Sequence, residues 1–266
     1  MNMFMSDIKY FYNDLVEAIQ SPGIWWRFAW LDIRLQYRRT FLGPFWLTLS
    51  FLMSGIALSI VYSQLLGIDD EVFFAYLLGG LSIWAFLSAA VMEGCGTFYS
   101  MAGMILERRL PLTVYALRLV SRNFITFCHN LIAVVLVFIY FKVALTPWTL
   151  LVIPGLLVLQ LNALWFSILF GIISTRYRDL QQLVTVLMTL TFFVTPIFWR
   201  KEMLGTRGII ADVNPFYHMI EIVRSPMLGH QPALTSWMVV LGITAVGMIV
   251  TFVVGSKYLR RLAYWL

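Results

Sequence analysis

The sequence predicts an all-α polytopic membrane protein, with six transmembrane helices preceded by interfacial helices. Its residues are 61% hydrophobic and only 12% charged, and the mean hydropathy is +0.83. A soluble domain carries about 25% charged residues, so this composition is typical of a chain that crosses a membrane several times. Apolar runs long enough to span a hydrocarbon core of about 30 Å are the second observation. They occupy residues 45–66, 72–98, 124–143, 148–175, 183–199 and 234–255.

Residues 1–44 are expected to form cytoplasmic interfacial helices, ahead of a transmembrane domain at 45–266. Over 6–20, apolar residues recur at helical spacing and form one stripe, which suits a helix lying on the membrane surface. A second helix is expected over 24–41, where aromatic rings typical of the headgroup level accompany several arginines.

Two acidic features accompany the second apolar run. The turn before it, 67–71, contains three adjacent acids, and we expect a solvated outer turn rather than a metal site. Glu93 lies near the far end of the run. An ionisable residue inside a span is often functional, but a glutamate close to the interface can also reach water, and both interpretations stand.

The connection after the second run is expected to lie in the cytoplasm and to contain a short helix at 105–109. Because proline cannot continue a helix, this helix stops before Pro111. The next inner loop, 176–182, is compact and basic. The fifth run, 183–199, is only just long enough to span.

Residues 200–232 are too polar to span the membrane and too apolar to form a free loop. Several prolines divide the segment, and Asn214-Pro215 is typical of a helix start, with asparagine as the cap and proline in the first turn. We expect one or two short re-entrant helices at the outer membrane face, where protein or a water-filled path surrounds them.

The distribution of positive charge predicts that both termini are cytoplasmic. With six spans, most of the 19 lysines and arginines fall in segments placed inside, as the positive-inside rule requires. The exceptions are Lys142, Arg200, Lys201, Arg207 and Arg224. The net charge of +6 could suggest nucleic acid, but anionic lipid headgroups and membrane orientation account for basic residues beside apolar runs more simply. No nucleic-acid partner is expected.

The sequence offers little chemistry of its own. It contains no phosphate-binding loop, no esterase or zinc-protease motif and no paired-cysteine motif, so we expect no catalytic residue, metal or cofactor in this chain. The spans also lack the ionisable or unwound polar sites that ion-coupled carriers use near the midplane. A transporter of this kind must receive its energy from another protein through its cytoplasmic surfaces.

Four segments carry a resemblance to a known family. They are DIRLQYRRTFLGPFW at 32–46, RYRD at 176–179, NPFYHMIEIVRSPMLG at 214–229 and LRRLAYW at 259–265. Together they resemble the permease subunits of polysaccharide-export ABC transporters, the bacterial exporters of O-antigen, capsule and teichoic acid. The resemblance runs through nearly the whole chain in order, whereas 104–112 matches only in position and character.

The resemblance implies a homodimer with two copies of a separate ABC ATPase at the cytoplasmic face, and ATP and Mg would be bound by that ATPase. The substrate would be a glycan linked to undecaprenyl pyrophosphate. Segment 104–110 would be the coupling helix, and 200–232 would contain the outer gate. The residues implied are Glu107, Arg108 and Arg109 for ATPase coupling, Arg176, Arg178 and Asp179 for the cytoplasmic loop, and Asn214, Pro215, Phe216 and Tyr217 for the gate.

The chemistry of such a substrate points to two further groups. A lipid pyrophosphate at the level of the inner headgroups needs cations, and guanidinium groups bind phosphate bidentately. Arg34, Arg38 and Arg39 are expected at that level, and the alternative is that they only orient the first span. A glycan path favours aromatic rings that stack on sugar faces without holding them firmly. The candidate rings are Tyr62, Phe192, Phe193 and Trp199. The alternative is that each packs between helices or faces lipid.

The expected function is that of a permease half-transporter for lipopolysaccharide biosynthesis, moving a lipid-linked, O-antigen-like polysaccharide across the bacterial inner membrane. The chain is not expected to be an enzyme. One alternative is an ABC permease that exports a drug or a lipid. Another is a membrane-embedded glycosyltransferase, which would need a gathered carboxylate or metal site, whereas Asp32, Glu107 and Asp179 are isolated in the sequence. A structural or signalling scaffold is a third, weaker alternative.

Overall fold

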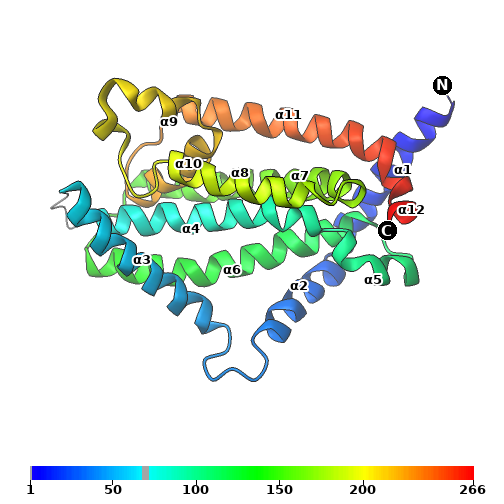
Figure 1. The fold of residues 1–266 in the computed structure, drawn as a ribbon, viewed down its shortest axis with the longest axis horizontal. Coiled ribbons are helices and arrows are strands. Elements are labelled where there is room, and N and C mark those ends of the chain that lie inside the picture. Colours follow the sequence, from blue (N-terminus) through cyan, green and yellow to red (C-terminus); the bar gives the residue numbers. More distant parts are fainter. Residues whose placement is uncertain (1, 68–71) are drawn as a thin grey trace.

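The structure, a computed structural model, describes residues 2–67 and 72–266, and every regular element in those two ranges is a helix (Figure 1). The helices are α1 (Asn2–Gln20), α2 (Pro22–Gln36), α3 (Phe45–Leu66), α4 (Phe73–Met92), α5 (Ala102–Glu107), α6 (Thr113–Tyr140), α7 (Val152–Arg176), α8 (Leu180–Val194), α9 (Ile209–Val213), α10 (Pro215–Met227), α11 (Leu234–Tyr258) and α12 (Leu262–Trp265). Short 3-10 turns connect several of them, namely η1 (Gly94–Gly96), η2 (Tyr99–Met101), η3 (Pro147–Leu151), η4 (Lys201–Gly208) and η5 (Leu259–Arg261).

Within the described part of the chain, five helical segments are long and apolar enough to cross a membrane. They are Phe45–Leu66, Phe73–Gly96, Thr113–Tyr140, Pro147–Arg176 and Leu234–Trp265. These segments, with the shorter apolar helix α8, confirm the predicted class of an all-α polytopic membrane protein.

The fifth expected span, 183–199, differs from the sequence prediction. The helix here is α8, which has 15 residues and therefore a length of about 22 Å. It ends at Val194 because Thr195 has extended backbone and Pro196 follows, and a residue before proline disfavours helical conformation. The chain from Thr195 to Trp199 is a bend instead of the end of a span.

The third span is longer than expected. α6 begins at Thr113, whereas the span was predicted from residue 124, so Arg118 and Arg122 lie within the helix. Pro111 precedes this start, and no proline or glycine interrupts the helix as far as Tyr140. Two arginines that the sequence placed in a cytoplasmic connection are therefore positioned rigidly by a membrane helix.

The long helices run side by side and give the molecule two distinct ends (Figure 1). Both termini, α5 and α12 lie at one end, and α9 and α10 lie at the opposite end. The two ends are called the inner end and the outer end below, after the orientation predicted from the sequence. α2 and α3 form a V whose tip, residues 37–44, projects from the side of the bundle. The acidic turn expected at 67–71 lies outside the described residues, apart from Gly67 at the end of α3.

α4 lies at the centre of the largest buried cluster, in contact with α3, α6, α7, α8 and α10. Leu77, Leu78 and Leu87 of this helix are fully buried. Small residues let the neighbouring backbones approach closely, as at Gly94, where an added Cβ would lie 3.1 Å from the Ser167 Cα of α7. This tight centre fixes the positions of the two ends on which the functional candidates lie.

Candidate functional site

The outer end is built around α10, which starts at the Asn-Pro pair seen in the sequence. The Asn214 side-chain oxygen accepts a hydrogen bond from the Phe216 N–H at 3.0 Å, so it caps the helix, and Pro215 occupies the first turn. The amide nitrogen of Asn214 donates to Thr195 Oγ1 at 2.8 Å. Asn214 therefore starts α10 and also ties it to the bend that follows α8.

Arg224 of α10 is almost fully buried, with 1% of its surface exposed. Its guanidinium pairs with Glu221, and Nη1 donates to the Pro196 carbonyl oxygen at 2.7 Å. The guanidinium carbon lies 3.9 Å from the centre of the Tyr76 ring of α4, and a Cβ at Gly80 would lie 2.9 Å from Nη1. A buried charge is tolerated only when it is paired and its remaining donors are satisfied, so this cluster joins α10, the bend and α4 into one unit.

Aromatic rings form a series across the outer half of the molecule, and it links α3, α8, α4, α10 and α7. Neighbouring rings in the series have centroids 4.3 to 6.4 Å apart. In order, its members are Tyr62, Phe198, Phe192, Trp84, Phe216 and Phe166. Such pairs add stability beyond simple burial, so the rings rigidify the outer half.

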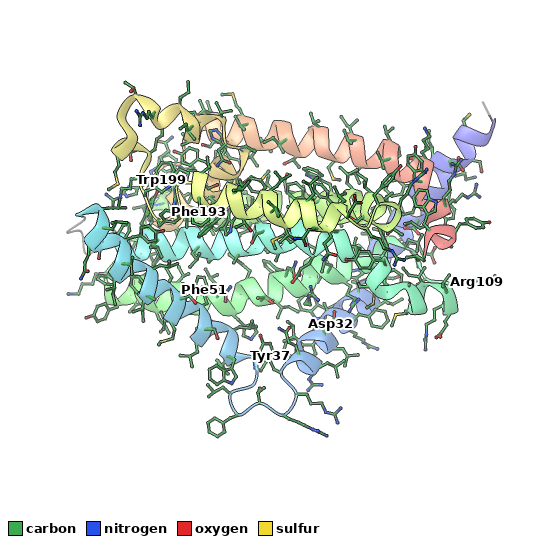
Figure 2. The ribbon with its side chains drawn as sticks, viewed as in Figure 1. Asp32, Tyr37, Phe51, Arg109, Phe193 and Trp199 are labelled. Atoms are coloured by element: carbon green, nitrogen blue, oxygen red, sulfur yellow. The ribbon has the colours of Figure 1, made fainter. Side chains whose placement is uncertain are left out.

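The four rings predicted for a glycan path therefore occupy different environments. Tyr62 and Phe192 belong to the aromatic series. Phe193 touches the ring of Phe192 but is 57% exposed, and Trp199 is half-buried at the outer end (Figure 2). Phe193 is thus the member of the predicted set with most of its ring free to contact another molecule. Of the predicted gate residues, Phe216 packs within the aromatic series and Tyr217 is half-buried beside His218.

The three arginines of segment 32–46 lie on the V formed by α2 and α3. Arg34 is in the last turn of α2, whereas Arg38 and Arg39 lie in the turn that follows it. All three are exposed, and none forms an ion pair with another described residue. Arg39 has a φ of 67°, a left-handed conformation that is uncommon for residues other than glycine. The guanidinium groups are therefore available to an anion from outside the chain.

The arm that carries these arginines is fixed to α6. Asp32 accepts hydrogen bonds from Nε and Nη2 of Arg118, each at 2.7 Å, which is a bidentate pair (Figure 2 labels Asp32). Ala29 and Ile33 of α2 are buried against Ile125, which lies about two turns further along α6 than Arg118. The carboxylate of Asp32 is thus occupied by a structural contact.

The predicted coupling residues lie at the inner end, at and just after the C-terminal end of the short helix α5. α5 spans Ala102–Glu107 rather than 105–109, and Arg108 already has extended backbone. Glu107, Arg108 and Arg109 are all exposed, and Arg109 lies at the inner end of the molecule (Figure 2). The three side chains are accessible to a protein that approaches this end.

Asp14 of α1 connects this region to the rest of the inner end. Its carboxylate accepts hydrogen bonds from the Leu112 N–H at 2.7 Å, the Thr113 N–H at 2.9 Å and the Thr113 hydroxyl at 2.6 Å. The side chain therefore caps α6 from another helix. Burial raises the pKa of the Asp14 carboxyl, and the hydrogen bonds from Thr113 and Leu112 oppose that rise because they stabilise the ionised form.

The loop between α7 and α8 carries the next predicted group. Arg176 ends α7, and its guanidinium carbon lies 5.3 Å from the centre of the Trp265 ring and 5.4 Å from that of Tyr177. Arg178 and Asp179 are exposed, and Asp179 precedes α8 without a capping hydrogen bond from its side chain. The structure thus brings Arg176 onto the C-terminal tail but leaves Arg178 and Asp179 at the surface.

No group of three or more His, Cys, Asp or Glu side chains that could hold a metal ion occurs among the residues that the structure describes. His218 is buried, with its ring nitrogens 2.9 Å from Ser236 Oγ and 2.8 Å from the Asp212 carbonyl oxygen. Both nitrogens therefore serve to connect α10 with its neighbours.

Sequence reasoning did not predict the roles of Arg224, Asp14 and Arg118. Arg224 was counted only as one of the positive charges of the outer segment 200–232, whereas the structure buries it. The sequence did contain one visible sign that α6 carries a polar site. Asn123, Thr126 and Asn130 recur at helical spacing after Arg122 and form a polar stripe in an apolar helix.

A family model described as ABC-2 type transporter matches residues 24–228, from α2 to the end of α10. The chain is 25% identical over 224 residues to an O-antigen export system permease protein RfbA of Myxococcus xanthus, covering 81% of this chain and 84% of that protein. Two proteins of the same name from Klebsiella pneumoniae are each 23% identical. One match covers 71% of this chain and 74% of the relative, and the other covers 88% and 89%.

Proposed function

The chain belongs to the ABC-2 type transporter family, and from that premise we propose that it is the membrane permease half of an ATP-driven polysaccharide exporter. Its substrate is a lipid-linked, O-antigen-like glycan, moved outward across a bacterial inner membrane. The observation that carries this proposal is the similarity to three proteins named as O-antigen export permeases, which extends over 71% to 88% of this chain. The geometry of both ends of the molecule supports it.

At the inner end, the exposed residues Glu107, Arg108 and Arg109 form the proposed docking point for a separate ATPase, which binds ATP and Mg. Asp14 gives this surface a mechanical role, because it joins the start of α6 to α1. α1 in turn packs on α11, where the Phe11 and Phe252 rings lie 5.5 Å apart. A displacement of the docking point is thereby passed to two membrane helices.

A pyrophosphate at the level of the inner headgroups needs cations that are not already paired. Arg34, Arg38 and Arg39 meet this requirement, since all three are exposed and guanidinium groups bind phosphate through two hydrogen bonds. At the opposite end, Asn214 and Arg224 hold the re-entrant helix α10 against α4 and the bend after α8. We propose that this unit is the outer gate.

We further propose that the chain functions as a homodimer. α3 has the length and composition of a membrane span, yet only 6% of its most apolar stretch is buried within the chain. An apolar groove of about 640 Å³ between α8 and α9 also opens to the outside, and Leu190, Ile210 and Val213 are among its exposed lining residues. A second copy would provide the other wall of a path, with Phe193 as an open ring for sugar stacking.

Removal of this chain from its host tests the proposal. We expect the cell surface to lose its long glycan while lipid-linked glycan accumulates inside. Reintroduction of the wild-type chain should restore the surface glycan and remove the accumulated lipid-linked glycan. The double variant R108E/R109E should not restore export, because it reverses the charge of the docking point. The control R207E, at an exposed outer position, should restore it. Unchanged surface glycan after removal would contradict the proposal.

A further inference from the structure

A polar pocket lies between the V of α2 and α3 and the helices α4 and α6 (Figure 1 shows the V). Its volume is about 360 Å³, within the range of about 300 to 1,000 Å³ typical of small-ligand sites. Residues from all four helices line it, including Gln36 of α2, Leu47 of α3 and Asn123 and Asn130 of α6. A polar lining between membrane helices is unusual, because polar groups inside a helix bundle require partners.

Asn123 carries unused hydrogen-bonding capacity. Asn123 is 5% exposed, and its amide nitrogen is buried without a hydrogen-bond partner among the described residues, whereas Asn130 is 7% exposed and lines the same pocket. Asn162 of α7 shows the contrast, since it is fully buried and binds both Thr244 and Trp165. A buried amide nitrogen without a partner costs stability, so Asn123 is explained better by a ligand than by packing, and Asn130 lines the pocket where the same ligand would lie.

The charge of the pocket selects the kind of ligand. Glu93 and Arg122 line it and pair with each other, so their charges cancel. The remaining polar groups are amides and the Thr126 hydroxyl, which donate and accept hydrogen bonds without formal charge. This combination suits a neutral polyol, whereas a phosphate would need a free cation.

Two contacts hold the arms of the V in place around the pocket. The bidentate pair between Asp32 and Arg118 fixes α2, and the Thr48 hydroxyl fixes α3 by donating to the His129 carbonyl oxygen at 2.8 Å. Gln36 lines the pocket, and Arg38 follows it by two residues in the exposed tip. A phosphate bound by the arginines of the tip would therefore bring the next chemical group of the same molecule to the mouth of the pocket.

We propose that this pocket binds the first sugar of the lipid-linked glycan, the sugar attached to the pyrophosphate. The inference rests on the proposed export function and adds a recognition site for the end of the substrate. Asn123 and Asn130 bind the sugar hydroxyls or an amide substituent, and the loop arginines bind the pyrophosphate. The glycerol headgroup of phosphatidylglycerol has the same neutral polyol chemistry, so the test must separate the two sources.

The test measures binding to the full-length chain in nanodiscs of phosphatidylethanolamine. The probes are undecaprenyl-pyrophosphoryl-N-acetylglucosamine, undecaprenyl pyrophosphate without sugar, and phosphatidylglycerol. In the variant N123L/N130L, affinity for the sugar-bearing lipid should fall about tenfold to thirtyfold, as expected for two lost hydrogen bonds. Affinity for undecaprenyl pyrophosphate should stay the same. Thermal stability should be retained, because the variant removes the buried, unpartnered amide nitrogen of Asn123.

Two further variants make the result specific. A89L fills the pocket from α4 without changing a polar group and should also lower affinity for the sugar-bearing lipid alone. The control N162L removes an amide that already has partners, so it should lower thermal stability and leave the ratio of the two affinities unchanged.

The outcomes separate the pocket from the function. Equal preference for the sugar-bearing lipid in wild type, N123L/N130L and A89L would overturn the pocket assignment alone. Weakened binding of phosphatidylglycerol instead of the sugar-bearing lipid would assign the pocket to phospholipid and also overturn the inference. Failure of the wild type to bind either undecaprenyl lipid would overturn the proposed function itself.

Discussion

α3 and α4 are consecutive spans of equal mean hydropathy, but they differ in how much of each is buried by the rest of the chain. In their most apolar stretches, 6% of α3 and 67% of α4 is buried inside the chain. A bilayer is as apolar as a leucine side chain, so hydropathy predicts that a helix enters the membrane but not what it touches there. The comparison shows that burial in this protein depends on small residues and polar ties rather than on apolar content.

The residues of the two helices explain the difference. α4 has Gly79 and Gly80, where neighbouring helices and the Arg224 side chain approach the backbone. α3 meets the rest of the chain mainly along one edge, with Gly55 against Leu78 and Phe51 packed on the central cluster (Figure 2 labels Phe51). Its other faces are left to lipid or, in the proposed dimer, to a second copy.

The largest expected effect lies at the outer end of α4. R224M leaves the Glu221 carboxylate partly buried without its counterion and empties the place beside Tyr76. Loss of one member of a buried ion pair costs about 3–5 kcal/mol, so we expect a loss of that size in the free energy of unfolding in detergent micelles. Thermal unfolding followed by circular dichroism measures it.

A double variant shows whether charge or packing causes that loss. E221Q/R224M removes both charges and should regain most of the stability lost in R224M, because no uncompensated charge remains. The exposed control R207M should unfold like the wild type. A double variant as unstable as R224M would show that shape rather than charge holds α10 to α4.

A matched pair of truncations tests the comparison directly. Leu87 of α4 is fully buried, whereas Leu65 of α3 is 72% exposed. L87A should lower the free energy of unfolding by about 2–5 kcal/mol, because it leaves a cavity in a packed core. L65A should change it by less than about 0.5 kcal/mol, since surface changes seldom cost more. Similar losses in both variants would show that α3 is packed against a partner under the conditions of the measurement.

Much of the fold could be predicted from the sequence because membrane spans follow from length and apolar content. The start of α10 also followed, since Asn214-Pro215 has local chemistry that specifies a helix start. The end of α8 was missed although Pro196 was visible, because apolar residues continue past it to Trp199. Apolar content alone was the wrong guide where a proline determined the backbone.

The candidate site was less predictable, since its organising contacts join residues far apart in the chain. The sequence suggested that Arg38 and Arg39 lie where a lipid pyrophosphate would arrive, which stays a prediction, and the structure leaves both side chains exposed. It could not indicate that Asp14 caps α6, because Asp14 and Thr113 are 99 positions apart and neither belongs to a motif. The same holds for Asp32, which was expected on the second interfacial helix, and Arg118, which was expected in the cytoplasmic connection; their pairing supports the V.

The smallest expected effect concerns the one side-chain hydrogen bond described between α3 and α6. T48V removes the hydroxyl that donates to the His129 carbonyl oxygen and changes little else in size. Hydrogen bonds between membrane helices average about 0.6 kcal/mol, so amide hydrogen exchange at the start of α3 should quicken by about threefold. The control T185V removes a hydroxyl that binds its own helix at Gln181, and exchange in α3 should not change. Exchange at wild-type rates in T48V would mean that lipid or a second copy, rather than this hydrogen bond, holds α3 in place. The chain itself would then contribute even less to the position of α3 than its 6% burial indicates.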